Sequence, residues 1–226
     1  ATEPVAESSE PESSESASQQ DSNAATEEDE LPEEEELTPE LVEEEAIRGD
    51  FMLRWAAVFL AILFGCSQIG NTSVLTLIRS GDAMRSGSFL PLGDDLLSYS
   101  LEGESTANVS WMYDHIISLV WATGAGVGLT VFKALVAGFV AWLLGRISVN
   151  GMPTWWSSIC VVLAMGACSI DFVPTPDLAT VVGMTVVLYL LHKQCEGELT
   201  GFAWKPGATI AIWCNFDSHA FLGVIA

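Results

Sequence analysis

The sequence predicts an all-α protein: a polytopic bundle of about five transmembrane helices, preceded by a disordered acidic tail. Two observations lead to this prediction. Half of the 226 residues are hydrophobic, yet the formal net charge is −22. The charge is also unevenly distributed, because residues 1–50 hold 19 of the 30 acidic residues and one basic residue, Arg48. The rest of the chain is mostly apolar, in segments long enough to cross a bilayer.

Residues 1–37 consist largely of Glu, Ser, Ala, Gln and Pro, with a run of acids at 33–36. Such a segment buries too little apolar surface to offset its chain entropy, so we expect it to be disordered. It is either a solvated spacer or a tail that binds a protein partner. Its charge repels phosphate, which argues against nucleic acid as a partner.

Residues 38–50 predict a juxtamembrane helix, because Thr38 is a good N-cap and Pro39 suits the first helical position. This helix runs either along the membrane surface or straight into the next segment. The transmembrane domain then occupies residues 51–226. The chain stops inside an apolar run, so we expect the domain to be truncated at its C-terminus. The expected spans are 51–69, 129–144, 155–170, 178–191 and 207–226, the last interrupted at 215–219.

A large loop, residues 70–123, separates the first two expected spans. We expect a short helix over 75–84 and an apolar helix that begins at Trp111 and ends before a glycine-rich turn at 124–128. Lys and Arg are more frequent in the loops on the side of the N-terminus, which predicts a cytoplasmic N-terminus. The 70–123 loop and the region around Asp217 then face outward.

Several ordered motifs resemble one family of membrane enzymes. They include Ser80-Gly-Asp82, the stretch from Asp94 to Ser100, Val109–Asp114, Phe172–Asp177 and Trp213–Gly223. Together they resemble the polyprenyl-phosphate-dependent glycosyltransferases of the GT-C class, closest to uncharacterised planctomycete-like bacterial members. The resemblance implies a multi-pass protein of the bacterial inner membrane and a polyprenyl-phosphate sugar lipid as donor. It also implies an acidic residue in the outer loop that activates the acceptor or binds a metal, and basic groups that hold the lipid phosphate.

Two positions depart from that family. Its members carry an Asp and a His shortly before the position of Gly81, where this chain reads Asn71-Thr-Ser-Val-Leu-Thr-Leu77. They also carry an Arg before the second proline of the 172–177 motif, where this chain has Thr175. These departures keep open a second hypothesis, a non-catalytic membrane scaffold or interaction protein with a GT-C-like fold. A transporter is a third.

Asp94 and Asp95 are the candidate catalytic residues. Adjacent carboxylates in an outer loop could take a proton from an acceptor hydroxyl or hold a divalent metal ion, and the resemblance favours this role. The alternative is a polar turn that caps a helix. No cofactor is certain from the sequence; the divalent ion is the one candidate. The cysteines and histidines are scattered, so local spacing predicts no metal site.

Six residues are the main candidates for binding substrate. We expect membrane lipids to surround this part of the chain. Lys133 is a cation inside an apolar span, which either holds the donor phosphate or snorkels to the interface. Trp111 could stack on a sugar beside Asp114 and His115, or anchor an interfacial helix. Asp217 and His219 either line an outer cavity or cap a helix. Asp177 has the same two interpretations, and its place just after Pro176 favours a cap.

Overall fold

The computed structural model describes residues 38–88, 92–94, 104–149, 151–169, 172–197 and 204–225. The chain forms two units, 1–38 and 39–226, and the description below concerns the second. The predicted tail, residues 1–37, lies outside the described residues. The helices are α1 (Pro39–Gly65), α2 (Ser73–Arg85), α3 (Trp111–Leu144), α4 (Thr154–Cys168), α5 (Pro176–Cys195), α6 (Trp204–Trp213), η1 (Ser218–Phe221) and α7 (Leu222–Ile225).

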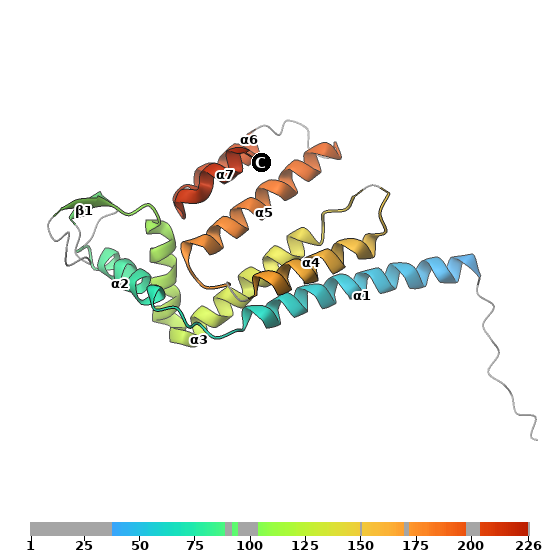
Figure 1. Ribbon diagram of the computed structural model, residues 1–226, viewed down its shortest axis with the longest axis horizontal. Coiled ribbons are helices and arrows are strands. Elements are labelled where there is room, and N and C mark those ends of the chain that lie inside the picture. Colours follow the sequence, from blue (N-terminus) through green and yellow to red (C-terminus); the bar gives the residue numbers. More distant parts are fainter. Residues whose placement is uncertain are drawn as a thin grey trace, which may run out of the picture. The chain divides into compact units, whose positions relative to one another are not determined.

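The first helix, α1, begins at Pro39 and continues through the predicted juxtamembrane segment into the first apolar stretch. The juxtamembrane segment therefore does not form a separate helix. The last 18 residues of α1 still include three charged side chains, Arg48, Asp50 and Arg54. In Figure 1, α1 lies along α4 and α3, and residues of all three helices are in contact.

Residues 70–123 contain the two predicted helices, and between these helices they form two short strands that were not predicted. The helix α2 covers the expected 75–84, and α3 begins at Trp111. Between them, β1 (Leu92–Asp94) and β2 (Ser105–Ala107) pair as an antiparallel ribbon, with Asp94 opposite Ser105. The all-α prediction missed this ribbon because three-residue strands leave no alternating hydrophobic pattern to detect.

The glycine-rich stretch after Thr123 interrupts α3 by a kink rather than by a loop. Ala125 has φ 46° and ψ −137°, values that no helix contains, although helical hydrogen bonding resumes on both sides. A non-glycine residue at positive φ is strained, so flanking Gly124 and Gly126 ease the turn. The kink separates an N-terminal half of α3, which packs on α2, from an apolar half of 19 residues, about 28 Å long.

Within the described residues, α3 and α5 are long and apolar enough to cross a membrane, and α4 is apolar but has 15 residues. Five spans are not shown. The predicted last span is broken, because α6 ends at Trp213 and η1 begins at Ser218. Large apolar side chains are exposed on every long helix, including Phe51, Trp55, Leu135, Leu163 and Leu188. Exposed apolar surface on this scale marks an interaction with a membrane or another protein.

Candidate functional site

Among the described residues, two clusters of polar side chains lie close to α5 or between α2 and α3. The α2–α3 cluster, between α2 and the N-terminal half of α3, comprises Ser80, Asp82, Arg85, Asn108, Asp114 and Ser118. The α5–η1 cluster, at the N-terminal end of α5, comprises Asp177, Thr180, Asp217 and His219. An apolar groove adjoins the second cluster.

Asn108 and Asp114 form the centre of the α2–α3 cluster. The Asn108 amide donates to Asp114 Oδ2 at 2.7 Å and to Ser80 Oγ at 3.1 Å. Ser118 Oγ donates to Asp82 Oδ1 at 3.0 Å, and Arg85 Nη1 reaches the same carboxylate at 3.3 Å. Asp114 is 2% exposed, and its Oδ1 has no hydrogen-bond partner among the described residues. A buried carboxylate with one unsatisfied oxygen is costly, so this cluster depends on close packing.

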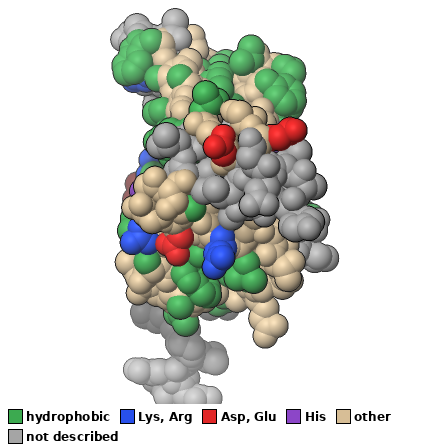
Figure 2. All heavy atoms as spheres, turned by 90° about the vertical axis from the view of Figure 1, so that its left-hand side faces the viewer, with side chains coloured by type: hydrophobic (Ala, Val, Ile, Leu, Met, Phe, Trp, Pro, Cys, Tyr) green, Lys and Arg blue, Asp and Glu red, His purple; other side chains and the backbone are tan. Residues whose placement is uncertain are grey.

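Gly81 makes that packing possible. A β-carbon at position 81 would overlap the Asp114 carbonyl oxygen and the Ser118 side chain, so only glycine lets α2 approach α3 this closely. The face of the molecule that carries α2 and the ribbon shows acidic and basic side chains next to one another (Figure 2). The centre of the cluster lies beneath that surface, because Ser80, Asp114 and Ser118 are all buried, whereas Asp82 and Arg85 are exposed.

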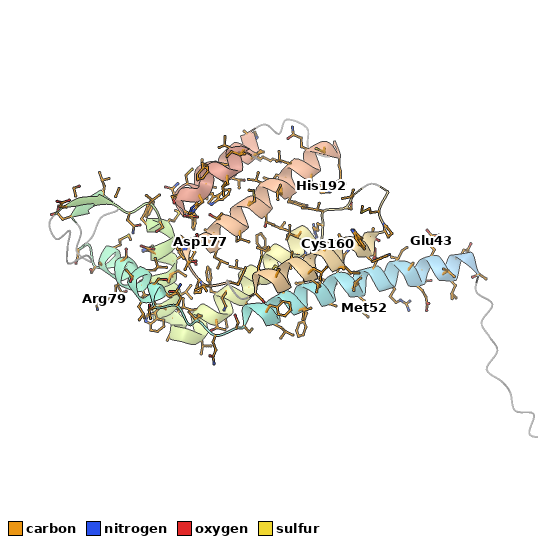
Figure 3. The ribbon with its side chains drawn as sticks, viewed as in Figure 1. Glu43, Met52, Arg79, Cys160, Asp177 and His192 are labelled. Carbon is orange, nitrogen blue, oxygen red and sulfur yellow. The ribbon has the colours of Figure 1, made fainter. Side chains whose placement is uncertain are left out.

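The α5–η1 cluster joins residues 37 to 42 positions apart in the sequence. Thr180 Oγ1 donates to Asp217 Oδ2, and His219 Nδ1 lies 3.1 Å from the same oxygen. His219 Nδ1 is also 4.0 Å from Asp177 Oδ1, in the first turn of α5. Figure 3 shows Asp177 and His192 at opposite ends of α5, so the cluster marks one end of that helix.

The Asp217 carboxylate is stabilised although it is only 5% exposed. Burial alone would raise its pKa, because a charge loses hydration. Hydrogen bonds from Thr180 and His219, together with the charge of the imidazole, outweigh burial and hold the pKa of Asp217 below its ordinary value. Asp217 is therefore a carboxylate at neutral pH.

Asp177, Asp217 and His219 could hold a divalent cation. One ligand atom from each residue lies within 4.8 Å of the other two. Two carboxylate oxygens and an imidazole nitrogen suit Mn²⁺ or Zn²⁺ better than the all-oxygen sets that Mg²⁺ and Ca²⁺ prefer. The other reading of the same geometry is a histidine placed between two carboxylates. The side chains of Asp177 and His219 are exposed, so a soluble ion or a headgroup could reach them.

The apolar groove has a volume of about 460 Å³ and opens between α3, α5 and α6. Trp213 links it to the α5–η1 cluster, because its Nε1 donates to Thr180 Oγ1 at 3.3 Å. Tyr113 also lines the groove; its buried hydroxyl has no hydrogen-bond partner among the described residues and lies within electrostatic reach of Asp177. The remaining lining is almost entirely apolar and includes Phe132, Val136, Leu178, Ala179, Val182 and Ile212.

Lys133 does not extend to the surface. Its side chain is 1% exposed, and Nζ donates to the Ser67 carbonyl at 2.6 Å and to Ser67 Oγ at 2.9 Å. Ser67 lies just beyond the C-terminal end of α1, where the helix dipole favours a cation. The ammonium group therefore ties α1 to α3 in this conformation. Its contact with a lipid phosphate stays a prediction.

The remaining residues predicted from the sequence to be catalytic or to bind substrate lie in other segments of the chain than the α5–η1 cluster. Asp94 is exposed at the end of β1, and Asp95 lies outside the described residues. Trp111 is half-buried in the first turn of α3, and His115 is exposed one residue after buried Asp114. The Met112 amide donates to the Asn215 carbonyl at 3.4 Å, which ties this end of α3 to the segment that carries Asp217.

Sequence reasoning missed the partners of these residues. Asn108 reads as part of a glycosylation triplet, and Thr180 and Tyr113 read as ordinary helix residues. The spacing of Asp217 and His219 was a usable signal of a polar site. An acid and a histidine two residues apart within an interrupted apolar segment are expected to have hydrogen-bond partners. Nothing in the sequence indicates that this partner is Thr180.

Compared with protein-family models, curated protein sequences and solved structures, the chain gives no match. The geometry of the site is therefore the basis on which a function can be proposed. The GT-C resemblance stays a prediction.

Proposed function

We propose that this chain is a GT-C-type membrane glycosyltransferase, which takes a sugar from a polyprenyl-phosphate carrier at the outer face of the bacterial inner membrane. The single observation that supports it best is the apolar groove beside the α5–η1 cluster. A polyprenyl phosphate has the same two parts, a long hydrocarbon chain and an anionic head. The apolar helices α3 and α5 and the distribution of Lys and Arg support the proposed location.

The hydrocarbon chain of the donor lies in the groove between α3, α5 and α6. Groove residues such as Phe132, Val182 and Ile212 offer it apolar contacts without polar groups that would lose hydration. Tyr113 adds one hydroxyl to the groove, within electrostatic reach of Asp177. In this arrangement the phosphate lies at the end of the groove that borders the α5–η1 cluster.

The phosphate needs positive charge, which two carboxylates cannot provide. A divalent cation held by Asp177, Asp217 and His219 would supply it and bridge protein to phosphate, as metal ions do in phosphoryl sites. Lys133 was the sequence-based candidate for this task, and its hydrogen bonds to Ser67 would have to break first. The cluster is therefore the better candidate for the donor head.

Asp94 and Asp95 remain the proposed general base. Asp94 is exposed on the ribbon, where the hydroxyl group of an acceptor molecule can approach it from the aqueous phase. Replacing both with Asn should abolish sugar transfer without loss of the bound carrier. Transfer that survives the double replacement would assign the base elsewhere.

The experiment for the donor site uses native mass spectrometry of the full chain with an added polyprenyl monophosphate. Ala179→Phe fills the groove, and Val181→Phe adds the same ring to an exposed position of α5 outside the groove lining. We expect Ala179→Phe to weaken carrier binding about tenfold, the equivalent of ~1.4 kcal/mol, while Val181→Phe binds like the wild type. Equal binding by both variants would reject the groove as the donor site.

The non-catalytic scaffold is the second candidate. The observation that favours it is the missing Asp and His before Gly81, because residues 71–77, which lead into α2, contain neither an acid nor a histidine. A protein that binds the carrier, or a partner of its acidic tail, but shows no transfer with any donor would support the scaffold.

A further inference from the structure

A second pocket lies between α1, α3 and α4, lined by different residues from those of the proposed donor site. Its volume is about 190 Å³. Arg54 of α1, Arg146 just after α3 and Ser158 of α4 are its polar lining residues, and Phe51, Trp55 and Trp142 are its aromatic ones. We propose that this pocket binds the phosphate of an anionic phospholipid headgroup.

Ser158 is the first reason to expect a ligand. The residue is 1% exposed, and its Oγ has no hydrogen-bond partner among the described residues. A serine in a helix commonly donates to a carbonyl of the preceding turn, as Ser157 does to Thr154, but Ser158 lines the pocket instead. A buried hydroxyl without a partner is unfavourable, and a phosphate oxygen would satisfy it.

The two arginines are the second reason. Two cations lining one small pocket repel each other unless an anion lies between them. Asp50 offsets Arg54 only in part, because their closest atoms are 3.8 Å apart and the pair is partly exposed. The Arg146 guanidinium lies over the Trp142 ring at 4.2 Å, which orients its N–H groups without neutralising it. Guanidinium groups bind phosphate with paired hydrogen bonds.

The aromatic side chains indicate a lipid rather than a soluble anion. Phe51 and Trp55 are exposed beside the pocket, and their rings contact edge to face. Aromatic residues next to arginines are typical of the headgroup level of a membrane. Arg54 and Arg146 belong to the set of basic residues on the predicted cytoplasmic side, where bacterial anionic lipids attract such groups. Acyl chains can then extend along the exposed apolar faces of α1 and α4.

The test measures lipid binding to the full chain after delipidation in detergent, by native mass spectrometry and by the shift in Tm. The probes are phosphatidylglycerol, zwitterionic phosphatidylcholine and inorganic phosphate. We expect the wild type to bind phosphatidylglycerol at least about tenfold more tightly than phosphatidylcholine. The double variant Arg54→Gln/Arg146→Gln should lose that preference, and Ser158→Ala should weaken it about threefold.

Arg48→Gln is the matched control, because Arg48 is exposed on α1, pairs with Glu44 and does not line the pocket. It should bind phosphatidylglycerol like the wild type. The inference is overturned if Arg54→Gln/Arg146→Gln binds as tightly as Arg48→Gln, or if phosphatidylcholine matches phosphatidylglycerol. An equal shift in Tm from inorganic phosphate would also overturn it, since the ligand would then be a soluble anion. Ser158→Ala keeps the test decisive if the double variant does not fold.

Discussion

The two polar clusters contain similar side chains in opposite surroundings. Asp114 in the α2–α3 cluster and Asp217 in the α5–η1 cluster are both almost fully buried carboxylates. Asp114 is enclosed between two helices, and its neighbours Ser80 and Ser118 are buried as well. Asp217 instead contacts His219, whose side chain is half exposed, and through Thr180 and Trp213 it borders an open groove.

The difference in burial distinguishes polar side chains that stabilise helix packing from polar side chains that a ligand can reach. The buried centre of the α2–α3 cluster can hold a loop and two helices in register, but a ligand reaches Asp114 only if the helices move. A cluster at the edge of a groove can receive a ligand without such movement. Resemblance alone pointed to both regions, and access is what makes the α5–η1 cluster the better candidate for binding.

The largest effect is expected where α2 and α3 touch. Gly81→Ala places a β-carbon against the Asp114 backbone, which cannot yield as a flexible side chain would, and should cost about 3 kcal/mol. Gly70→Ala is the control, because no atom lies within 4 Å of a β-carbon there, and it should stay within about 0.5 kcal/mol. Thermal unfolding in detergent measures both. Equal Tm values would show that the helices are not in close contact.

Removing the Asn108 amide should have the next largest effect. Asn108→Ala removes the 2.7 Å hydrogen bond to buried Asp114 and should cost about 2 kcal/mol of unfolding free energy. Asp114→Asn removes the charge that needs that donor, so the two changes should be coupled. A double-mutant cycle measures the coupling. Additive effects would mean that the two side chains do not interact.

Asp217→Asn should change the pH dependence of stability. The folded pKa of Asp217 lies below its ordinary value of 3.8, so the carboxylate stabilises the fold fully above that value. The contribution is lost as the pH falls from 3.8 through the depressed folded pKa. The gap in Tm between wild type and Asp217→Asn should therefore close in acid, as the pH falls below 3.8. A gap that widens in acid would contradict the direction of this shift.

The smallest change in stability is expected at His219, because its side chain is half exposed. His219→Gln should shift unfolding by less than about 0.5 kcal/mol, yet it should abolish binding of Mn²⁺ or of the spectroscopic substitute Co²⁺. His192→Gln is the control, since His192 lies at the other end of α5, where it pairs with Glu196. If the Co²⁺ spectra of His219→Gln are the same as those of the wild type, His219 is not a metal ligand and only contacts the two carboxylates.

Much of the backbone was predictable, because caps and prolines act locally. Thr38-Pro39 and Pro176 mark the starts of α1 and α5, and Trp111 opens α3 as expected. The ribbon that carries Asp94 was not predictable, since short strands depend on pairing across a loop. Lys133 shows the same limit for side chains. Its unusual position was evident, but its partner, Ser67, is 66 residues away and becomes adjacent only when α1 packs on α3.

We propose that the groove between α3, α5 and α6 holds the hydrocarbon chain of a polyprenyl phosphate. The most direct measurement is photolabelling of the full chain with a polyprenyl monophosphate that carries a diazirine on its isoprenoid chain, followed by peptide mapping. We expect the labels to be concentrated on groove residues such as Phe132, Val182 and Ile212, and to be competed away by unlabelled carrier. Labels spread evenly over the exposed apolar faces of α1 and α4, or unaffected by competitor, would contradict it.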